Sequence, residues 1–180
     1  MTTTKLLAMA GFALTLMAFD TPAAQPAATC TSAEHRQMDF WLGSWVARDK
    51  AGQLLGHQLI ELNEQGCVLQ EWWRGNGQAN GAGTSLSMYD QKRKLWNHSW
   101  FSARGNLLSI EGSWNGKAMV MTGYYQNAEG IRELHRTQWQ PLADGRVYQF
   151  WQSSLDGGLT WTSIHEAWMS RTTDPIAKSF

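Results

Sequence analysis

The chain has 180 residues, of which 43% are hydrophobic and 12% are aromatic. Fifteen Lys and Arg residues balance fifteen Asp and Glu residues, so the formal net charge is zero. Binding to nucleic acids or to anionic membranes depends on an excess of positive charge, so this balance argues against both partners. Eleven tryptophans are far more than a chain of this length ordinarily carries, and they are the main signal in the composition.

The N-terminus has the pattern of a secretory signal peptide. Lys5 precedes an apolar run over residues 6–19, and small residues with prolines follow over 21–28. We therefore predict that residues 1–24 are a cleaved signal peptide and that the protein is exported, to the periplasm or the medium. The apolar run is shorter than the ~20 residues of a membrane-spanning helix, and no later run approaches that length. No integral membrane segment is expected in the mature chain.

Both cysteines, Cys30 and Cys67, follow the signal segment. An oxidising compartment favours pairing of two such thiols, so we predict one disulfide. Thr31 with Glu34 three residues later is a capping-box signature, and apolar residues then fall on one helical face as far as Leu42. Residues 25–43 are therefore predicted to form an N-terminal segment with one short helix.

From Ser44 onward the helical period is replaced by runs of about six to ten residues between turn signals. The turns are predicted at 49–52, 63–66, 75–83, 90–94, 103–106, 115–116, 126–130, 144–145 and 156–158. Nine turns separate about ten strands, and short turns join neighbours as an antiparallel meander. Such a sheet avoids exposed edges by closing, so residues 44–171 are predicted to be an all-β, up-and-down, lipocalin-like barrel, with 172–180 as a tail. An immunoglobulin-like sandwich is the competing fold.

Residues 154–161 (SLDGGLTW) fit the Asp-box pattern S-x-D-x-G-x-T-W. Asp boxes recur in sialidase propellers, but one copy in a chain of this length cannot build several four-stranded blades. The motif therefore predicts a hairpin whose Asp side chain satisfies turn N–H groups, not a glycosidase.

Trp96 and Trp100 are an even number of residues apart, so in a strand they share a face with His98 between them. We predict that such faces form a pocket for a small apolar or aromatic ligand, in which indoles supply contact area and polar groups supply orientation. The candidate walls are Trp73, Trp96, Trp100, Trp139 and Trp151, and the candidate orienting groups are Glu71, Tyr89, His98, Gln149 and His165. Which face of residues 148–151 points inward is left open, because both faces carry aromatics.

Three other functions remain open. A barrel enzyme would use His98 or His165 as acid or base, and His165 could instead serve as an axial ligand to haem. No H-x-H or H-E-x-x-H spacing supports a metal site, and no other cofactor is predicted. An envelope structural or interaction protein is the third alternative, for which Ile164 and Trp168 suggest an outer apolar patch.

Five segments carry a resemblance to a known family: 39–45 (DFWLGSW), 66–72 (GCVLQEW), 85–90 (SLSMYD), the Trp96–Trp100 pair and 144–151 (DGRVYQFW) with Trp161. Together they resemble a bacterial exported family of unknown function. The resemblance implies a lipocalin-like barrel and a disulfide to the Gly-Cys pair. The family usually has Gln at position 98, Asn at 87 and an aromatic residue at 165, so His98, Ser87 and His165 depart from it. The haem-binding nitrobindins have similar barrels, but their G-x-W-x-G opening is missing.

Overall fold

A computed structural model describes residues 30–63, 65–77, 81–176 and 178 of the chain. The predicted signal peptide, residues 1–24, lies outside the described residues. No helix in the described part of the chain has both the length and the apolar character needed to cross a membrane.

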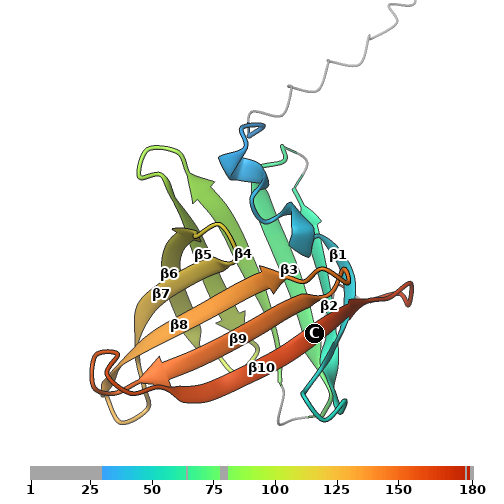
Figure 1. Ribbon diagram of the computed structural model, residues 1–180. Helices are drawn as coiled ribbons and strands as arrows, with labels where there is room; N and C mark the ends of the chain where they lie inside the picture. Colours follow the sequence, from blue (N-terminus) through green and yellow to red (C-terminus); the bar gives the residue numbers. More distant parts are fainter. Residues whose placement is uncertain (1–29, 64, 78–80, 177, 179–180) are drawn as a thin grey trace, which may run out of the picture.

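Ten antiparallel strands form one closed barrel (Figure 1). The strands are β1 (Gly43–Arg48), β2 (Leu54–Leu62), β3 (Val68–Gly75), β4 (Ala82–Asp90), β5 (Leu95–Ser102), β6 (Leu107–Trp114), β7 (Met119–Gln126), β8 (Arg132–Pro141), β9 (Val147–Ser154) and β10 (Thr162–Arg171). Each strand pairs with its neighbours in sequence, and β1 closes the ring against β10 with Trp45 opposite Arg171. The predicted up-and-down barrel of ten strands is confirmed, and the sandwich alternative is excluded.

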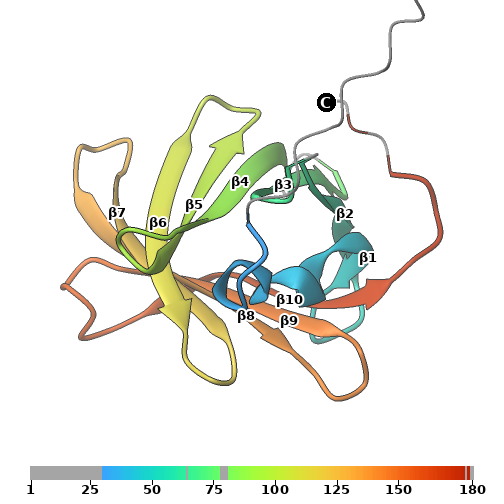
Figure 2. The ribbon, with the colours of Figure 1, turned by 90° about the horizontal axis from the view of Figure 1, so that it is seen from above.

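The predicted short helical segment is present as two 3₁₀ turns, η1 (Glu34–Arg36) and η2 (Asp39–Trp41). The capping box is wrong in detail, because Ala33 is the N-cap of η1 and no side chain caps it. We call residues 30–42 the plug, since seen from above they lie over one end of the ring of strands (Figure 2). Met38 and Trp41 of the plug are fully buried.

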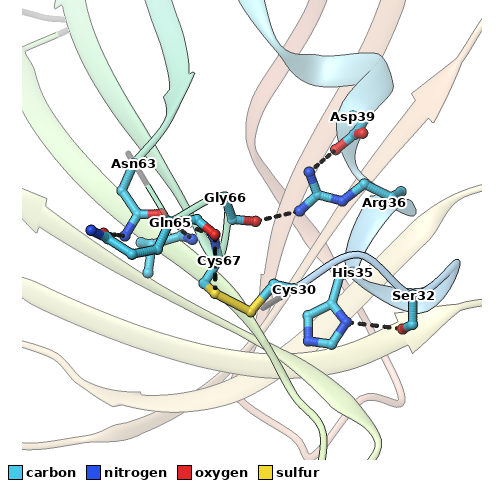
Figure 3. Close-up of polar contacts among 10 residues, drawn as sticks. Cys30, Ser32, His35, Arg36, Asp39, Asn63, Gln65, Gly66 and Cys67 are labelled. Carbon is cyan, nitrogen blue, oxygen red and sulfur yellow. Dashed lines mark hydrogen bonds and ion pairs between the residues drawn. A yellow bond between two sulfur atoms is a disulfide. The ribbon is translucent and has the colours of Figure 1, made fainter. Parts of the chain in front are cut away.

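Three contacts hold the plug against the barrel. The predicted disulfide joins Cys30 to Cys67 in the β2–β3 turn, and beside it the Arg36 guanidinium donates to the carbonyl oxygen of Gly66 (Figure 3). On the other side, the indole N–H of Trp96 donates to the Gln37 side chain (3.1 Å). The plug is therefore part of the folded barrel and closes its end.

The barrel interior is divided along its axis. The end under the plug is filled by large side chains that are almost completely buried: Met38, Trp41, Trp45, Ile60, Leu69, Trp96, Met119, Met121, Trp139, Val147 and Met169. The opposite end carries the β1–β2, β3–β4, β5–β6, β7–β8 and β9–β10 turns, and its interior is not filled. This asymmetry places the candidate site in the open half.

The open question about residues 148–151 is settled by the strand register. Gln149 and Trp151 face the interior, whereas Tyr148 and Phe150 stack on each other outside it (ring centroids 6.0 Å apart). Tyr148 also packs on Trp168 of β10 and donates a hydrogen bond to Glu166 (2.7 Å). This outer aromatic contact stabilises the β9–β10 pair without contributing to the interior.

The Asp-box sequence forms the expected hairpin between β9 and β10. Asp156 accepts hydrogen bonds from the backbone N–H groups of Leu159 and Thr160 and from the Thr160 hydroxyl. These bonds, with that of Thr160 first, hold the pKa of Asp156 well below its usual range. The Trp161 indole N–H donates to the Gly158 carbonyl oxygen (3.0 Å). The motif is thus a structural turn at the open end.

The disulfide provides the first test of how the plug contributes to stability. Replacing both Cys30 and Cys67 by Ser removes a cross-link that closes a loop of 37 residues. On the chain-entropy account, we expect the free energy of unfolding to fall by about 3–4 kcal/mol, measured by urea denaturation. Reduction of the unmodified protein should lower the stability equally, and a double variant as stable as the unmodified protein would contradict the expectation.

Candidate functional site

The open half of the barrel contains a cavity of about 350 Å³. Its lining combines aromatic and aliphatic walls with a few polar groups: Glu71, Trp73, Gly81, Ala82, His98, Trp100, Ser102, Arg104, Asn106, Leu108, Ile110, Thr137, Trp139, Gln149, Trp151, Ile164 and His165. A volume in this range, apolar walls and few polar groups are the usual properties of a small-molecule site.

Two indoles of the wall lie against glycines on neighbouring strands. A Cβ placed on Gly83 of β4 would come within 2.3 Å of the Trp100 ring, and one on Gly56 of β2 within 2.8 Å of the Trp73 ring. The lack of a side chain at each glycine therefore makes room for the tryptophan ring on the neighbouring strand. The indoles line the wall at these points instead of filling the lumen.

Trp151 is held by a histidine on the adjacent strand. Its indole N–H donates to His135 Nδ1 (2.8 Å), and because Trp can only donate, Nδ1 must be the acceptor nitrogen. Neutral His135 therefore carries its proton on Nε2, which lies 3.3 Å from a carboxylate oxygen of Glu133. Burial lowers the pKa of His135, against an opposing effect of Glu133. His135 thus supports the cavity wall and is not part of the lining.

A strip of buried polar side chains crosses β2 to β5; we call Gln58, Glu71, Ser85, Ser87 and His98 the polar strip. At its centre, the Ser85 hydroxyl donates to one carboxylate oxygen of Glu71 (2.7 Å). With the Gln58 amide oriented to satisfy both its ends, its nitrogen donates to the other oxygen of Glu71 (2.8 Å). Burial raises the pKa of Glu71 to about 7, although the Ser85 hydrogen bond opposes the shift.

His98 lies on the other side of β4 from Glu71. The Ser87 hydroxyl is 2.8 Å from His98 Nδ1, and the ring packs on Trp139 with centroids 5.0 Å apart. Among the described residues no hydrogen bond is made by Nε2, the nitrogen that remains for a bound molecule. Burial lowers the pKa of His98 to about 4, so the ring is neutral at pH 7.

Trp139 lines the inner end of the cavity and has a buried donor that lacks a partner in the described part of the chain. Its side chain is 1% exposed, and its Nε1 has no hydrogen-bond partner among the described residues. The ring lies between His98 and Trp41 of the plug, 5.4 Å from the latter. Among the described residues, the Trp139 indole is therefore held by ring packing and not by a hydrogen bond.

His165 stands near the mouth of the cavity, edge-on to Trp73 (5.7 Å, 85°). Burial lowers its pKa, so it too is neutral at pH 7. The strand register shifts between Ser163 and His165, a β-bulge that leaves Ile164 unpaired and at the cavity mouth. Strict alternation predicted that Ile164 and Trp168 share the outer face. Because of the bulge, Ile164 instead lies at the cavity mouth.

The structure brings most of the predicted site residues together. Those lining the cavity are Glu71, Trp73, His98, Trp100, Trp139, Gln149, Trp151 and His165. Tyr89 and Trp96 point inward but lie at the plugged end, where Tyr89 packs on His35 (5.1 Å) and Trp96 bonds to Gln37. Both therefore support the plug.

Several residues of the site have no signal in the sequence. Gln58, Ser85 and Thr137 are ordinary strand residues, and only the register shows that they face Glu71 or the cavity. Arg104 and Asn106 belong to a short turn whose position at the cavity mouth depends on closure of the barrel. Leu108 and Ile110 are two residues apart, so they share one face of β6. Alternation would have identified both residues if the sequence had shown which face of β6 points inward.

The arrangement can bind a small molecule and can exchange protons with it. Glu71, which titrates near pH 7, and neutral His98 both reach the cavity. Over the described ranges, no group of three or more His, Cys, Asp or Glu side chains is placed to hold a metal ion.

The pKa shifts of Glu71 and His98 have opposite signs, so we predict that their effects on the pH dependence of the unfolding free energy offset each other. Variants that remove one of the two groups should reveal the effect of the other. The pKa of Glu71 rises from 4.5 to about 7, so its share of stability is complete below pH 4.5 and is lost as the pH rises to 7. The pKa of His98 falls from 6.5 to about 4, so its share is complete above pH 6.5 and is lost as the pH falls to 4. The two trends offset each other in the unmodified protein.

Relative to the unmodified protein, His98→Gln should lose about 3 kcal/mol of unfolding free energy between pH 4 and 6.5, and Glu71→Gln should gain about as much between pH 4.5 and 7. Urea denaturation at a series of pH values measures both. Because all surface groups are common to the three proteins, their contributions cancel in the comparison. Identical pH profiles for all three proteins would contradict the assigned shifts.

Gly83→Ala tests the packing of the Trp100 wall. The new Cβ would lie 2.3 Å from the ring and 2.7 Å from the Phe101 carbonyl oxygen. We expect a loss of about 1–3 kcal/mol in unfolding free energy, measured by urea denaturation. Adding Trp100→Phe, which removes the clashing ring, should make the combined loss smaller than the sum of the two single losses. Strict additivity would show that Gly83 does not accommodate the indole.

Comparison with known proteins adds no relative. No family model matches the chain, and no curated protein matches its sequence. The resemblance to an exported family is therefore supported only in its coarse part, the closed antiparallel barrel.

Proposed function

We propose that the protein binds a small, largely apolar or aromatic molecule inside its barrel. The observation that carries the proposal is the 350 Å³ cavity with walls of Trp73, Trp100, Trp139 and Trp151. Indoles supply large, rigid contact areas, and burying a ligand against them is driven by the hydrophobic effect. The unfilled space next to a tightly packed plugged end supports a binding role over a purely structural one.

Polar groups at the inner end of the cavity would orient the molecule. Glu71 offers carboxylate oxygens, His98 offers Nε2, and Gln149 offers an amide from the adjoining wall. A small number of polar groups in an apolar cavity favours one orientation of the ligand. Any other orientation would leave some of these groups without a hydrogen bond, which costs free energy.

The proposal places this activity outside the cytoplasm. The disulfide between Cys30 and Cys67 holds the plug that closes the barrel, and such bonds persist in oxidising compartments. The export predicted from the N-terminal sequence agrees with this placement.

An enzyme acting in the same cavity is the second candidate, favoured by the titration of Glu71. A carboxyl group whose pKa is about 7 is suited to give or take a proton at neutral pH. Neutral His98 would act as the partner base or hydrogen-bond donor on the bound molecule. Conversion of a retained molecule, lost in Glu71→Gln and His98→Gln while binding persists, distinguishes this candidate from a binding protein.

Haem ligation by His165 is a third proposal with its own readout. The ring reaches the cavity mouth beside Trp73. Addition of haem should then produce a Soret band that His165→Ala loses, and the lack of a band in the unmodified protein would exclude haem.

Native mass spectrometry of the disulfide-intact protein from its own host tests the binding proposal. We expect a retained small molecule with a 1:1 ratio to the protein. Leu108→Trp should abolish retention, because Leu108 is 6% exposed and lines the cavity.

Leu86→Trp is the matched control, since Leu86 is 42% exposed on the outer face of β4 and should not affect retention. Equal retention by both variants would place the molecule elsewhere, and a protein that neither retains a molecule nor binds any small aromatic probe would contradict the proposal.

A further inference from the structure

The charges around the cavity are few and unevenly placed. Among the described residues that line the cavity, Glu71 is the only acidic one and none is a lysine. Arg104, the only other residue of fixed charge in the lining, belongs to the exposed β5–β6 turn at the mouth. The two histidines, His98 and His165, are neutral at pH 7. Among the described residues, the inner cavity therefore offers one carboxyl group and no positively charged group.

Over the described part of the chain, the Glu71 carboxylate has no positive partner. Its hydrogen bonds come from the neutral side chains of Ser85 and Gln58, and among the described residues no Lys, Arg or His pairs with it. Burial of an unpaired carboxylate is unfavourable, and its raised pKa expresses that cost. A positive charge brought into the cavity would remove the cost.

The walls around Glu71 suit such a charge. Trp is the side chain whose π face attracts cations best, and the attraction grows when the cation is desolvated. Trp73, Trp100, Trp139 and Trp151 enclose the same cavity as Glu71. An aromatic enclosure with one carboxylate is the arrangement with which proteins recognise ammonium groups.

We propose that the ligand of this cavity is a small organic cation, an amine with an aromatic or apolar body whose ammonium group lies beside Glu71 among the indoles. This inference rests on the proposed binding function and names the class of ligand. The ammonium pairs with the carboxylate, and the body of the molecule extends along the indole wall toward the mouth.

Other ligand classes fit less well. An anionic ligand would meet the Glu71 carboxylate at the inner end of a cavity with a low local dielectric, which is repulsive. A neutral apolar ligand would bury the Glu71 carboxylate further without offering it a hydrogen bond, which is unfavourable. Arg104 at the mouth disfavours a second positive charge at the outer end, so the cation carries its charge at one end only.

The test uses two probes of nearly equal shape, 2-phenylethylammonium and neutral 2-phenylethanol, titrated at pH 8 into the disulfide-intact protein and followed by calorimetry. At this pH, Glu71, with a pKa of about 7, is mostly ionised. We expect the ammonium to bind the unmodified protein at least about tenfold more tightly than the alcohol, because the charge pair is desolvated. This comparison needs no variant and so does not depend on the folding of one.

Glu71→Gln should reduce the affinity for the ammonium about tenfold or more and change that for the alcohol less than about threefold. Glu111→Gln is the matched control, because it removes the same charge from an exposed position on the outer face, where Glu111 pairs with Arg93. It should change neither affinity. Circular dichroism in the near ultraviolet establishes that each variant keeps the native packing of its tryptophans.

The outcomes separate the two levels of the proposal. If the alcohol binds as tightly as the ammonium, or if Glu71→Gln leaves the preference for the ammonium unchanged, the cation inference is overturned while cavity binding stands. If neither probe binds the unmodified protein, the cation inference is overturned, and the retention experiment then decides separately whether the cavity holds another molecule.

Discussion

The structure depends on a hydrogen-bonded chain that runs from the plug to the cavity. The Trp41 indole N–H donates to the Gln58 amide oxygen (3.1 Å), and the Gln58 nitrogen donates to Glu71, whose other oxygen accepts from Ser85. Each of these groups is buried and would be costly to leave unpaired. The plug that fills one end of the barrel therefore also orients the carboxylate that faces the other end, so stability and the candidate site share the same contacts.

Ten strands make a ring too wide to be filled by its own strand residues alone, and the plug resolves this at one end only. Trp41 enters from η2 and packs on Trp139, so the plugged half is filled by buried side chains. No second segment enters from the opposite side among the described residues. The cavity is thus a consequence of closing the barrel with a single short segment, anchored by Cys30 at the β2–β3 turn.

The turn signals predicted the strands and the closure of the sheet, because each hairpin depends on a few local residues. Alternation correctly placed His98 and Trp100 on one inward face, but a period of two specifies a face and not a height along the barrel. That is why Trp96, two residues from His98, supports the plug instead of the cavity. The bulge at Ile164 broke the alternation, and nothing local in the sequence marks it. Gln58 could not be found either, because its role exists only through register with a distant strand.

Glycines on neighbouring strands explain why two of the inward-facing tryptophans, Trp73 and Trp100, do not fill the barrel. Trp73 lies diagonally across from Gly56, and Trp100 from Gly83, so both rings occupy space that any larger residue on the neighbouring strand would take. With these two indoles against the wall, the open half keeps a cavity, and the buried Glu71 is part of its lining. The two glycines therefore leave room for a bound molecule by letting the indoles lie against the wall. The Glu71 carboxylate provides the charged group that such a molecule would contact.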